Sequence, residues 1–386
     1  MRSSHLPPPA SFSAALVATI IGFGGTVALV VQAGQALGAS PSQIISMLAA
    51  LAIGIGATGA VLSWRLKMPV VLAWSTPGAA LLAATTAGYD WATAVGAFVL
   101  AGLMMVLTGL IPVLGRLAGR IPSGIAAGML AGVLLPFCLK LFQALPLDMV
   151  LIASLVAVFL GFRRLAPVWA VPAVLVVAFT VLAVRGQLAL PLDNGLFTRL
   201  DPTMPHLDWK AAIGLAVPLY LVTLASQNLP GLVVLKNAGY APPANRLIFW
   251  GGLTSTLMAP FGAHGVNLAA ITAAICTDAD AHPDAAQRWK VGVIYGLLYL
   301  CVAAFIPPLA QLFMDMPPHI LASITGLALI APLTGALITV FTHEKGREAA
   351  ILTFVATASG LALFGVGSAF WGLVAGFAAL LVLRRN

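Results

Sequence analysis

Two stretches decide the fold of this chain: Ala73-Trp74-Ser75-Thr76-Pro77-Gly78 and Phe261-Gly262-Ala263-His264-Gly265-Val266-Asn267. Each interrupts an apolar region with small, polar and helix-starting residues, where a membrane helix would be continuous. The apolar run 79–84 follows the first and the run 268–275 follows the second. A pair of interrupted spans in corresponding halves is the best sequence pointer to the binding site of a secondary transporter. We therefore expect a binding site at these two breaks.

Composition places the chain in the membrane. Of 386 residues, 61% are hydrophobic and 8% are charged. Apolar runs recur at the ~20-residue length that crosses a bilayer core. The net charge of +8 does not predict nucleic-acid binding, because the basic residues fall in short loops between the runs. Three cysteines, each in or beside an apolar run, imply no disulfide framework.

The pattern predicts an all-α polytopic membrane protein with about 14 transmembrane segments. The predicted spans cover residues 12–33, 43–63, 69–86, 92–113, 122–139, 147–162, 166–184, 211–235, 245–259, 262–277, 288–307, 318–340, 349–364 and 367–383.

Basic residues predict the orientation, because cytoplasmic loops carry an excess of Lys and Arg. With a cytoplasmic amino terminus, the outer side keeps only Lys140, Arg185, Arg199 and Lys210. The cytoplasmic side then carries Arg2, Arg65, Lys67, Arg116, Arg120, Arg163, Arg164, Lys236, Arg246, Arg288, Lys290, Lys345, Arg347, Arg384 and Arg385. Both termini are therefore predicted to be cytoplasmic.

A polar segment divides the spans into two sets of seven. We expect a first repeat at residues 1–185, an extracytoplasmic linker at 186–210 and a second repeat at 211–386. An odd number of spans per set makes any repeat an inverted one. Weak similarity supports this, since Pro122 and Pro136 open and close the fifth span as Pro318 and Pro332 open and close the twelfth.

The first break predicts an extended segment over 68–75 and a helix that starts near Thr76 or Pro77, because proline favours the first turn of a helix. Gly262 and Gly265 suggest a similar arrangement at the second break. A half-helix start leaves free amides and a positive dipole end, which suit an anionic group. Irregular backbone at this depth must be buried in protein or line a wet cavity.

His264 is the one ionisable side chain predicted well inside a span. All eleven acidic residues fall in loops or at span ends. An intramembrane ionisable group is a functional hypothesis by default, and imidazole gains and loses a proton at ordinary pH. The alternative is a neutral histidine that hydrogen-bonds to backbone in a packed turn.

Two further polar stretches are candidates. Ser226-Gln227-Asn228 puts three consecutive polar residues in the eighth span, where they face either a cavity or neighbouring helices. In the first span, the segment Gly22-Phe23-Gly24-Gly25-Thr26 lets a ligand approach the backbone with Phe23 as an apolar wall. Small-residue helix packing explains the same segment.

Four segments carry a resemblance to a known family. They are GFGGTVALVVQAGQALG (22–38), VVLAWSTPGAALLA (70–83), ASQNLPGLVVLKNAGY (225–240) and FGAHGVNLAAITAAICTDADAHPD (261–284). The chain resembles the bacterial benzoate/proton symporter family over essentially its whole length. That family is distantly similar to nucleobase transporters and sulfate-type anion transporters.

The resemblance implies two inverted repeats of seven spans, with a short extended segment and a half-helix in spans 3 and 10. It implies a core domain from spans 1–4 and 8–11 and a gate domain from spans 5–7 and 12–14. The implied substrate-binding residues are Phe23, Gly24, Thr26, Ser75, Thr76, Pro77, Gly78, Ser226, Gln227, Asn228, Ala263, His264, Gly265 and Asn267. His264 is the implied proton-coupling group.

One departure from the nucleobase transporters bears on the substrate. Those relatives carry acidic residues in spans 8 and 10, where this chain has Ser226 and His264. A neutral base would lose its main anchors, whereas an aromatic carboxylate would escape like-charge repulsion. The departure therefore favours benzoate.

The leading hypothesis is a secondary active transporter that imports benzoate or a related aromatic carboxylate by proton symport with alternating access. It would work in the bacterial inner membrane with protons and membrane lipid as partners, without a cofactor or metal ion, either alone or as a homodimer. Transport of another small anion or a nucleobase-like solute, by exchange or uniport, stays open. A membrane-embedded enzyme is not expected, since the zinc-protease and Gly-x-Ser-x-Gly motifs are absent.

Overall fold

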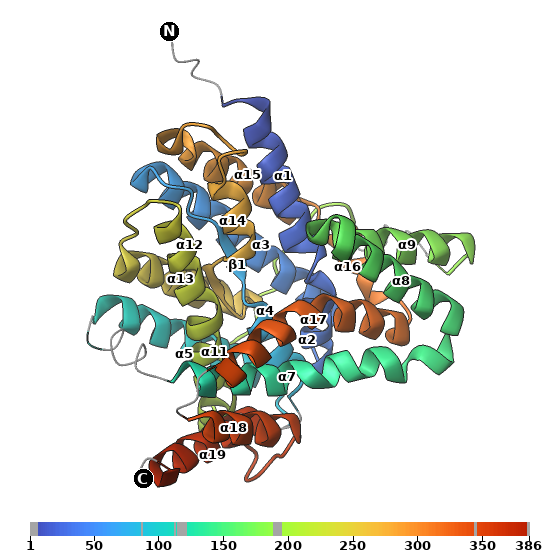
Figure 1. Cartoon of the computed structure of the whole chain (residues 1–386), viewed down its shortest axis with the longest axis vertical. Coiled ribbons are helices and arrows are strands. Elements are labelled where there is room, and N and C mark those ends of the chain that lie inside the picture. Colours follow the sequence, from blue (N-terminus) through green and yellow to red (C-terminus); the bar gives the residue numbers. More distant parts are fainter. Residues whose placement is uncertain are drawn as a thin grey trace.

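The computed structural model describes residues 7–85, 88–111, 113, 122–187, 195–342 and 346–383, and they are mostly helical (Figure 1). The first half comprises α1 (Pro9–Gly24), α2 (Val27–Ala36), α3 (Pro41–Leu66), β1 (Leu72–Trp74), α4 (Thr76–Ala83), α5 (Trp91–Leu110), α7 (Ser123–Gln143), α8 (Met149–Leu165) and α9 (Ala170–Val184).

The second half begins with one helical run that contains two π-helical turns. It consists of α10 (Trp209–Ala211), a π turn (Ala212–Ala216), α11 (Val217–Thr223), a π turn (Leu224–Asn228) and α12 (Leu229–Asn237). Then follow α13 (Ala244–Met258), β2 (Val266–Leu268), α14 (Ile271–Thr277), α15 (Trp289–Ala304), α16 (Ile306–Met314), α17 (Pro318–Thr342), α18 (Arg347–Ala358) and α19 (Ser368–Leu383).

Seven helical segments in the described part of the chain are long and apolar enough to cross a membrane, or eight if the bent pair of α15 and α16 is one span. The chain is thus a multi-pass helical membrane protein, as predicted. Every predicted span overlaps at least one of these helices or a shorter one. The count of 14 stays a prediction. Helix α16, bent 69° from the preceding helix, was not predicted as a separate helix, and all but its first two residues lie between the predicted spans 288–307 and 318–340.

The two breaks meet in the middle of the fold. Strands β1 and β2 form a two-stranded antiparallel sheet with Leu72 opposite Leu268, Ala73 opposite Asn267 and Trp74 opposite Val266. Antiparallel pairing is the geometry expected where two half-spans enter from opposite sides. The extended segment predicted before Thr76 is confirmed.

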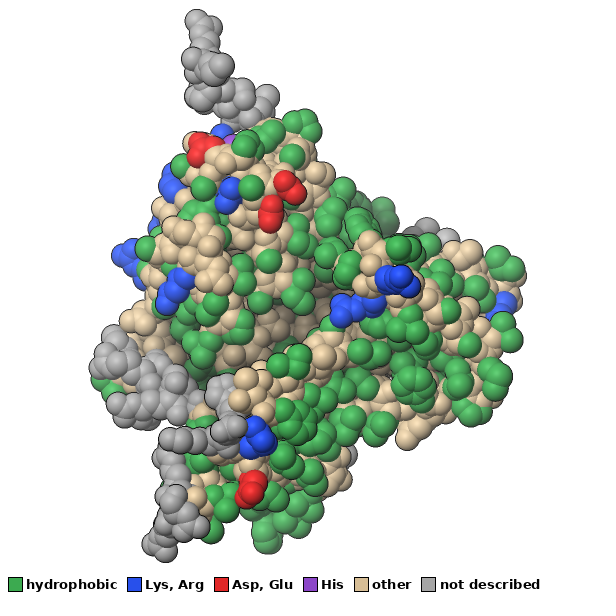
Figure 2. All heavy atoms as spheres, viewed as in Figure 1, with side chains coloured by type: hydrophobic (Ala, Val, Ile, Leu, Met, Phe, Trp, Pro, Cys, Tyr) green, Lys and Arg blue, Asp and Glu red, His purple; other side chains and the backbone are tan. Residues whose placement is uncertain are grey.

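Long helices of the two halves pack in pairs. Helix α3 packs against α15, α5 against α13, and α7 against α17. Figure 1 shows α7 and α17 running beside each other, with α18 and α19 below them and α8 and α9 extending to one side. Hydrophobic side chains are spread over much of the face in Figure 2 and few charged ones lie among them, as a lipid-facing surface requires.

The paired prolines do not close their helices, so that part of the sequence prediction is wrong. Helix α7 continues past Pro136 to Gln143, and α17 continues past Pro332 to Thr342. In a membrane helix, neighbouring groups and local adjustments compensate for the hydrogen bond that a proline removes. The two helices that contain these prolines are packed partners.

The nine described acidic residues lie in loops, at helix caps or in a first turn, as predicted. Asp148, for example, caps α8, and the Arg185 guanidinium bound to it holds the pKa of its carboxyl below the ordinary value. Asp193 and Glu344 lie outside the described residues. So do Arg2, Arg116, Arg120, Lys345, Arg384 and Arg385, on which part of the predicted orientation rests.

Candidate functional site

The first break ends in a well-capped half-helix. Ser75 is the N-cap of α4, and its Oγ accepts a hydrogen bond from the Gly78 amide at 3.0 Å. Its carbonyl accepts one from the Ala79 amide at 2.7 Å. Pro77 occupies the first turn, where its missing N–H leaves no donor unpaired. Local sequence therefore fixes where this helix starts.

The second break follows a different course. A short 3-10 turn (Ala259–Phe261) ends at Gly262 in the left-handed region, with φ of 95°. The chain then forms β2, and α14 begins only at Ile271, with no side chain capping its N-terminus at Ala270. The predicted site residues Ala263 to Asn267 thus precede or form the strand and do not start the helix.

Side chains of the second half hold the carbonyls and cap of the first break. The Tyr295 hydroxyl donates to the Leu72 carbonyl at 2.9 Å, and the side-chain amide of Asn267 donates to the Ala73 carbonyl at 3.3 Å. His264 Nε2 lies 3.2 Å from the Ser75 carbonyl, and Thr223 donates to Ser75 Oγ at 2.8 Å. These four donors come, in the order given, from α15, β2, the segment before β2, and α11.

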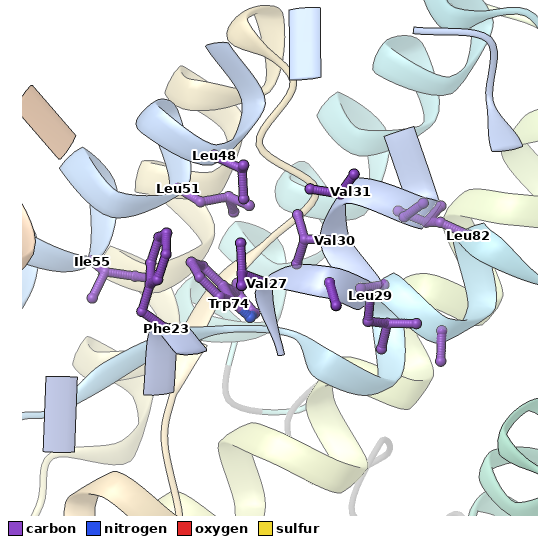
Figure 3. Close-up of a cluster of buried hydrophobic side chains, with 14 of the residues drawn as sticks. Phe23, Val27, Leu29, Val30, Val31, Leu48, Leu51, Ile55, Trp74 and Leu82 are labelled. Carbon is purple, nitrogen blue, oxygen red and sulfur yellow. The ribbon is translucent and has the colours of Figure 1, made fainter. Parts of the chain in front are cut away.

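The break between α1 and α2 joins the first strand through Trp74. The Trp74 indole N–H donates to Thr26 Oγ1 at 2.7 Å, and the hydroxyl of Thr26 donates to the Gly22 carbonyl at 3.2 Å. The Trp74 ring meets Phe23 edge-on at 5.5 Å between centroids and Tyr299 at 6.4 Å. Figure 3 shows Phe23 and Trp74 in one buried cluster with residues of α2, α3 and α4.

The three polar residues of the eighth span separate by role. They lie in or at the end of the π turn Leu224–Asn228, a distortion that often marks functional sites. Asn228 is buried and accepts from the Leu268 amide at 3.2 Å, so it holds β2. Ser226 donates to the Val222 carbonyl of its own helix. The Gln227 amide is partly exposed.

Burial divides the predicted substrate-binding residues into two groups. The front group, partly exposed, is Gly24, Thr26, Thr76, Ser226 and Gln227. The rear group, buried, is Phe23, Ser75, Pro77, Gly78, Asn228, Ala263, His264, Gly265 and Asn267. The front residues come from three separate segments, at the α1–α2 break, the start of α4 and the second π turn.

Two narrow spaces lie near these groups. One, too narrow for a water molecule, is lined by Gly25, Thr26 and Leu29 together with Ile324 and Thr325 of α17. Beside it, Gln32 of α2 donates to Thr325 Oγ1 at 2.5 Å. The other has a volume of about 10 Å³, room for about one water molecule, and is lined by His264, Asn267, Thr223, Tyr220, Ser255 and apolar neighbours.

Sequence reasoning missed several residues that build the site. Thr223 and Tyr295 are isolated polar residues in apolar helices, and nothing local marks them as partners of the first break. Tyr295 and Tyr299 are one helical turn apart, and this spacing was the available signal. No group of three or more His, Cys, Asp or Glu side chains that could hold a metal ion occurs among the residues described.

Comparison with known proteins identifies the family. The family model described as benzoate membrane transport protein matches residues 6–382. This chain belongs to that family. It is 37% identical over 386 residues to the inner membrane protein YdcO of Escherichia coli, covering 100% of this chain and 98% of that protein. It is 34% identical over 373 residues to the benzoate membrane transport protein of Acinetobacter baylyi, covering 96% and 94%.

Solved structures share the fold at low sequence identity. The transmembrane domain of the cyanobacterial bicarbonate transporter BicA matches with a TM-score of 0.65 at 17% identity, covering 95% of this chain and 96% of that chain. The murine anion transporter Slc26a9 in its inward-facing state matches with a TM-score of 0.65 at 13% identity, covering 99% and 69%. The predicted likeness to anion transporters is confirmed for the fold. The family is one of membrane transport proteins and not of enzymes.

Proposed function

We propose that this chain imports benzoate or a related aromatic carboxylate together with a proton, by alternating access across the bacterial inner membrane. The observation that carries the proposal is the meeting of the two broken spans at the β1–β2 pair, in a chain of the benzoate membrane transport protein family. The names of the two relatives support the substrate class and the membrane.

The carboxylate binds at the front group, beside the N-terminus of α4. That end of the helix carries a positive partial charge, and Thr76 and Gln227 supply partly exposed polar side chains there. Within the described part of the chain, neither side chain makes a hydrogen bond to another residue. The aromatic ring lies along the glycine-lined break between α1 and α2, next to Phe23. The rear group supports this site from behind.

His264 carries the coupled proton. It is 2% exposed, and no carboxylate among the described residues lies inside a long helix to replace it. Movement of an anion and a proton together is electroneutral. A lone anion moving against an inside-negative potential would instead require about 2.3 kcal/mol per 100 mV.

Alternating access requires two bodies that move relative to each other. We assign the core to spans 1–4 and 8–11, and the gate to spans 5–7 and 12–14, as the family resemblance implies. The contact between Gln32 of α2 and Thr325 of α17 would then join core and gate beside the front group.

The repeats are 1–185 and 211–386, with both termini and the loop at Arg163 and Arg164 cytoplasmic and the linker outside. Single-cysteine labelling of intact cells tests this orientation, and labelling at position 164 but not at 195 would contradict it.

Uptake of radiolabelled benzoate into proteoliposomes, with and without an imposed pH gradient, tests the function. We expect accumulation when the lumen is alkaline relative to the outside and little accumulation without the gradient. Benzoate uptake that does not depend on the pH gradient would indicate exchange or uniport. Uptake of another small anion or a nucleobase, with no uptake of benzoate, would show that the substrate class is wrong.

A further inference from the structure

The second space described above is lined by three residues of the rear group, His264, Gly265 and Asn267. Among the residues that line it, His264 and Asn267 are each 2% exposed, Thr223 is 4% exposed and Ser255 is 5% exposed. It lies where α5, α11 and α13 pack around the segment that precedes β2. We call it the rear chamber. The gate helix α17 contributes residues to the other space and none to this one.

One nitrogen of His264 lacks a partner although the ring is buried. Nε2 lies 3.2 Å from the Ser75 carbonyl, and a carbonyl can only accept, so Nε2 carries the hydrogen. In the neutral ring, Nδ1 is then an acceptor, and it makes no hydrogen bond to any described residue. A buried acceptor without a donor is destabilising, so Nδ1 requires a water molecule or a proton.

We propose that the rear chamber holds water and delivers the coupled proton to Nδ1 of His264, separately from the carboxylate, which binds at the front group. The proposal rests on the proposed symport. The step is a simple proton transfer, in which hydronium in the chamber protonates the Nδ1 lone pair and leaves water. Later in the transport cycle, the reverse step releases the proton on the other side of the membrane.

Ser75 connects the two sites. Its carbonyl accepts from His264 Nε2 and from the Ala79 amide, while its Oγ caps α4 at Gly78. Protonation at Nδ1 turns the Nε2–H bond into a charge-assisted one and puts a full positive charge behind the α4 N-terminus. A carboxylate in front is then bound more tightly. By reciprocity the bound carboxylate favours the proton equally.

No charged side chain lines the rear chamber. The residues that line the chamber include no carboxylate, ammonium or guanidinium group, and Phe98 of α5 meets the His264 ring edge-on at 6.3 Å. Tyr220 of α11 is the other titratable side chain in the lining, and its hydroxyl pairs with Thr108 at 2.7 Å. Within this lining, Nδ1 of His264 is therefore the one basic nitrogen available to the proton.

Thr223 is a positioning residue in this arrangement. It lines the chamber and also donates to Ser75 Oγ, so it links chamber and cap. Replacing it with valine keeps its shape and removes the hydroxyl. Thr254→Val is the matched control, because Thr254 is a buried threonine of neighbouring α13 whose hydroxyl pairs with Thr58 and does not line the chamber.

The test compares wild type, His264→Gln, Thr223→Val and Thr254→Val in proteoliposomes, by benzoate exchange, by gradient-driven accumulation and by the pH profile of benzoate affinity. For wild type and Thr254→Val, affinity should rise as pH falls. His264→Gln should lose gradient-driven accumulation, still exchange benzoate, and bind it at every pH with the affinity that wild type shows at high pH. Thr223→Val should accumulate about three- to tenfold less than Thr254→Val, with a displaced pH profile.

Several results would overturn the inference. His264→Gln with wild-type accumulation and pH profile would show that Nδ1 takes no coupled proton. Loss of exchange together with accumulation would put the anion itself on His264. If His264→Gln does not insert, a Thr223→Val profile identical to that of Thr254→Val decides against the chamber. A wild-type protein that exchanges benzoate without responding to the gradient would refute the symport, and the inference with it.

Discussion

The two breaks share a plan of strand followed by half-helix, yet they are held in different ways. The first is capped by its own Ser75 and bound by Thr223, His264, Asn267 and Tyr295, all from the second half of the chain. The second has no side-chain cap. Its strand is bound by Ser255 and Asn228, which belong to its own half. From the described residues of the other half, the second break receives one side-chain hydrogen bond, from Ser46 to the Phe261 carbonyl at 3.0 Å. The difference teaches that the shape of the first break depends more on how the halves meet.

The start of α4 leaves no room for an added side chain at Gly78. A Cβ at Gly78 would lie 2.6 Å from Leu219 Cδ1 and 2.8 Å from Ser75 Oγ, closer than packed atoms approach. At Gly265 in the second break, the nearest such atom is Asn267 Oδ1 at 3.3 Å. The predictions below test whether this difference in construction is also a difference in function.

The largest effect is expected from Gly78→Ala. The added methyl pushes the cap away from the α4 amides, and overpacking of this kind destabilises by about 1–3 kcal/mol. Benzoate affinity should fall about tenfold or more, measured by equilibrium binding to the purified protein. Gly59→Ala on α3 is the control, because its Cβ would have no atom nearer than 3.4 Å. Equal affinities in the two variants would show that the carboxylate binds away from α4.

An intermediate effect is expected from Ser75→Ala. The variant removes the cap from the Gly78 amide and leaves the Thr223 hydroxyl without its acceptor, and loss of an N-cap costs about 1 kcal/mol. Affinity should fall about fivefold. Ala270→Ser at the second break should change little, because Ala270 has helical dihedrals (φ −104°, ψ −55°) and not the extended ones of a capping residue. A gain of affinity with Ala270→Ser would abolish the contrast between the breaks.

The smallest effect is expected from Tyr295→Phe. It removes one hydrogen bond, to the Leu72 carbonyl of β1, while the ring keeps its packing beside Tyr299. A single bond of this kind contributes about 1 kcal/mol. The thermal unfolding midpoint should fall by a few degrees with benzoate affinity nearly unchanged. A large loss of affinity would mean that β1 itself contacts the substrate.

The sequence predicted those features that depend on neighbouring residues. Pro77 and Ser75 are adjacent to the helix they start, so the break before Thr76 was readable from propensity and capping chemistry alone. The absence of acidic residues from the spans was likewise a local observation. The later start of α14 was not readable, because no capping residue marks it.

The sequence by itself thus determined a multi-pass membrane protein with two broken spans and a lone histidine at one of them. Only the tertiary structure decided that Ala73 pairs with Asn267, that Thr223 and Tyr295 hold the first break across 148 and 223 residues of chain, and that His264 lies behind the cap. The physical reason is range. Capping acts between neighbours in the chain, whereas the partners of a carbonyl in an apolar interior are whichever donors the folded helices bring within reach.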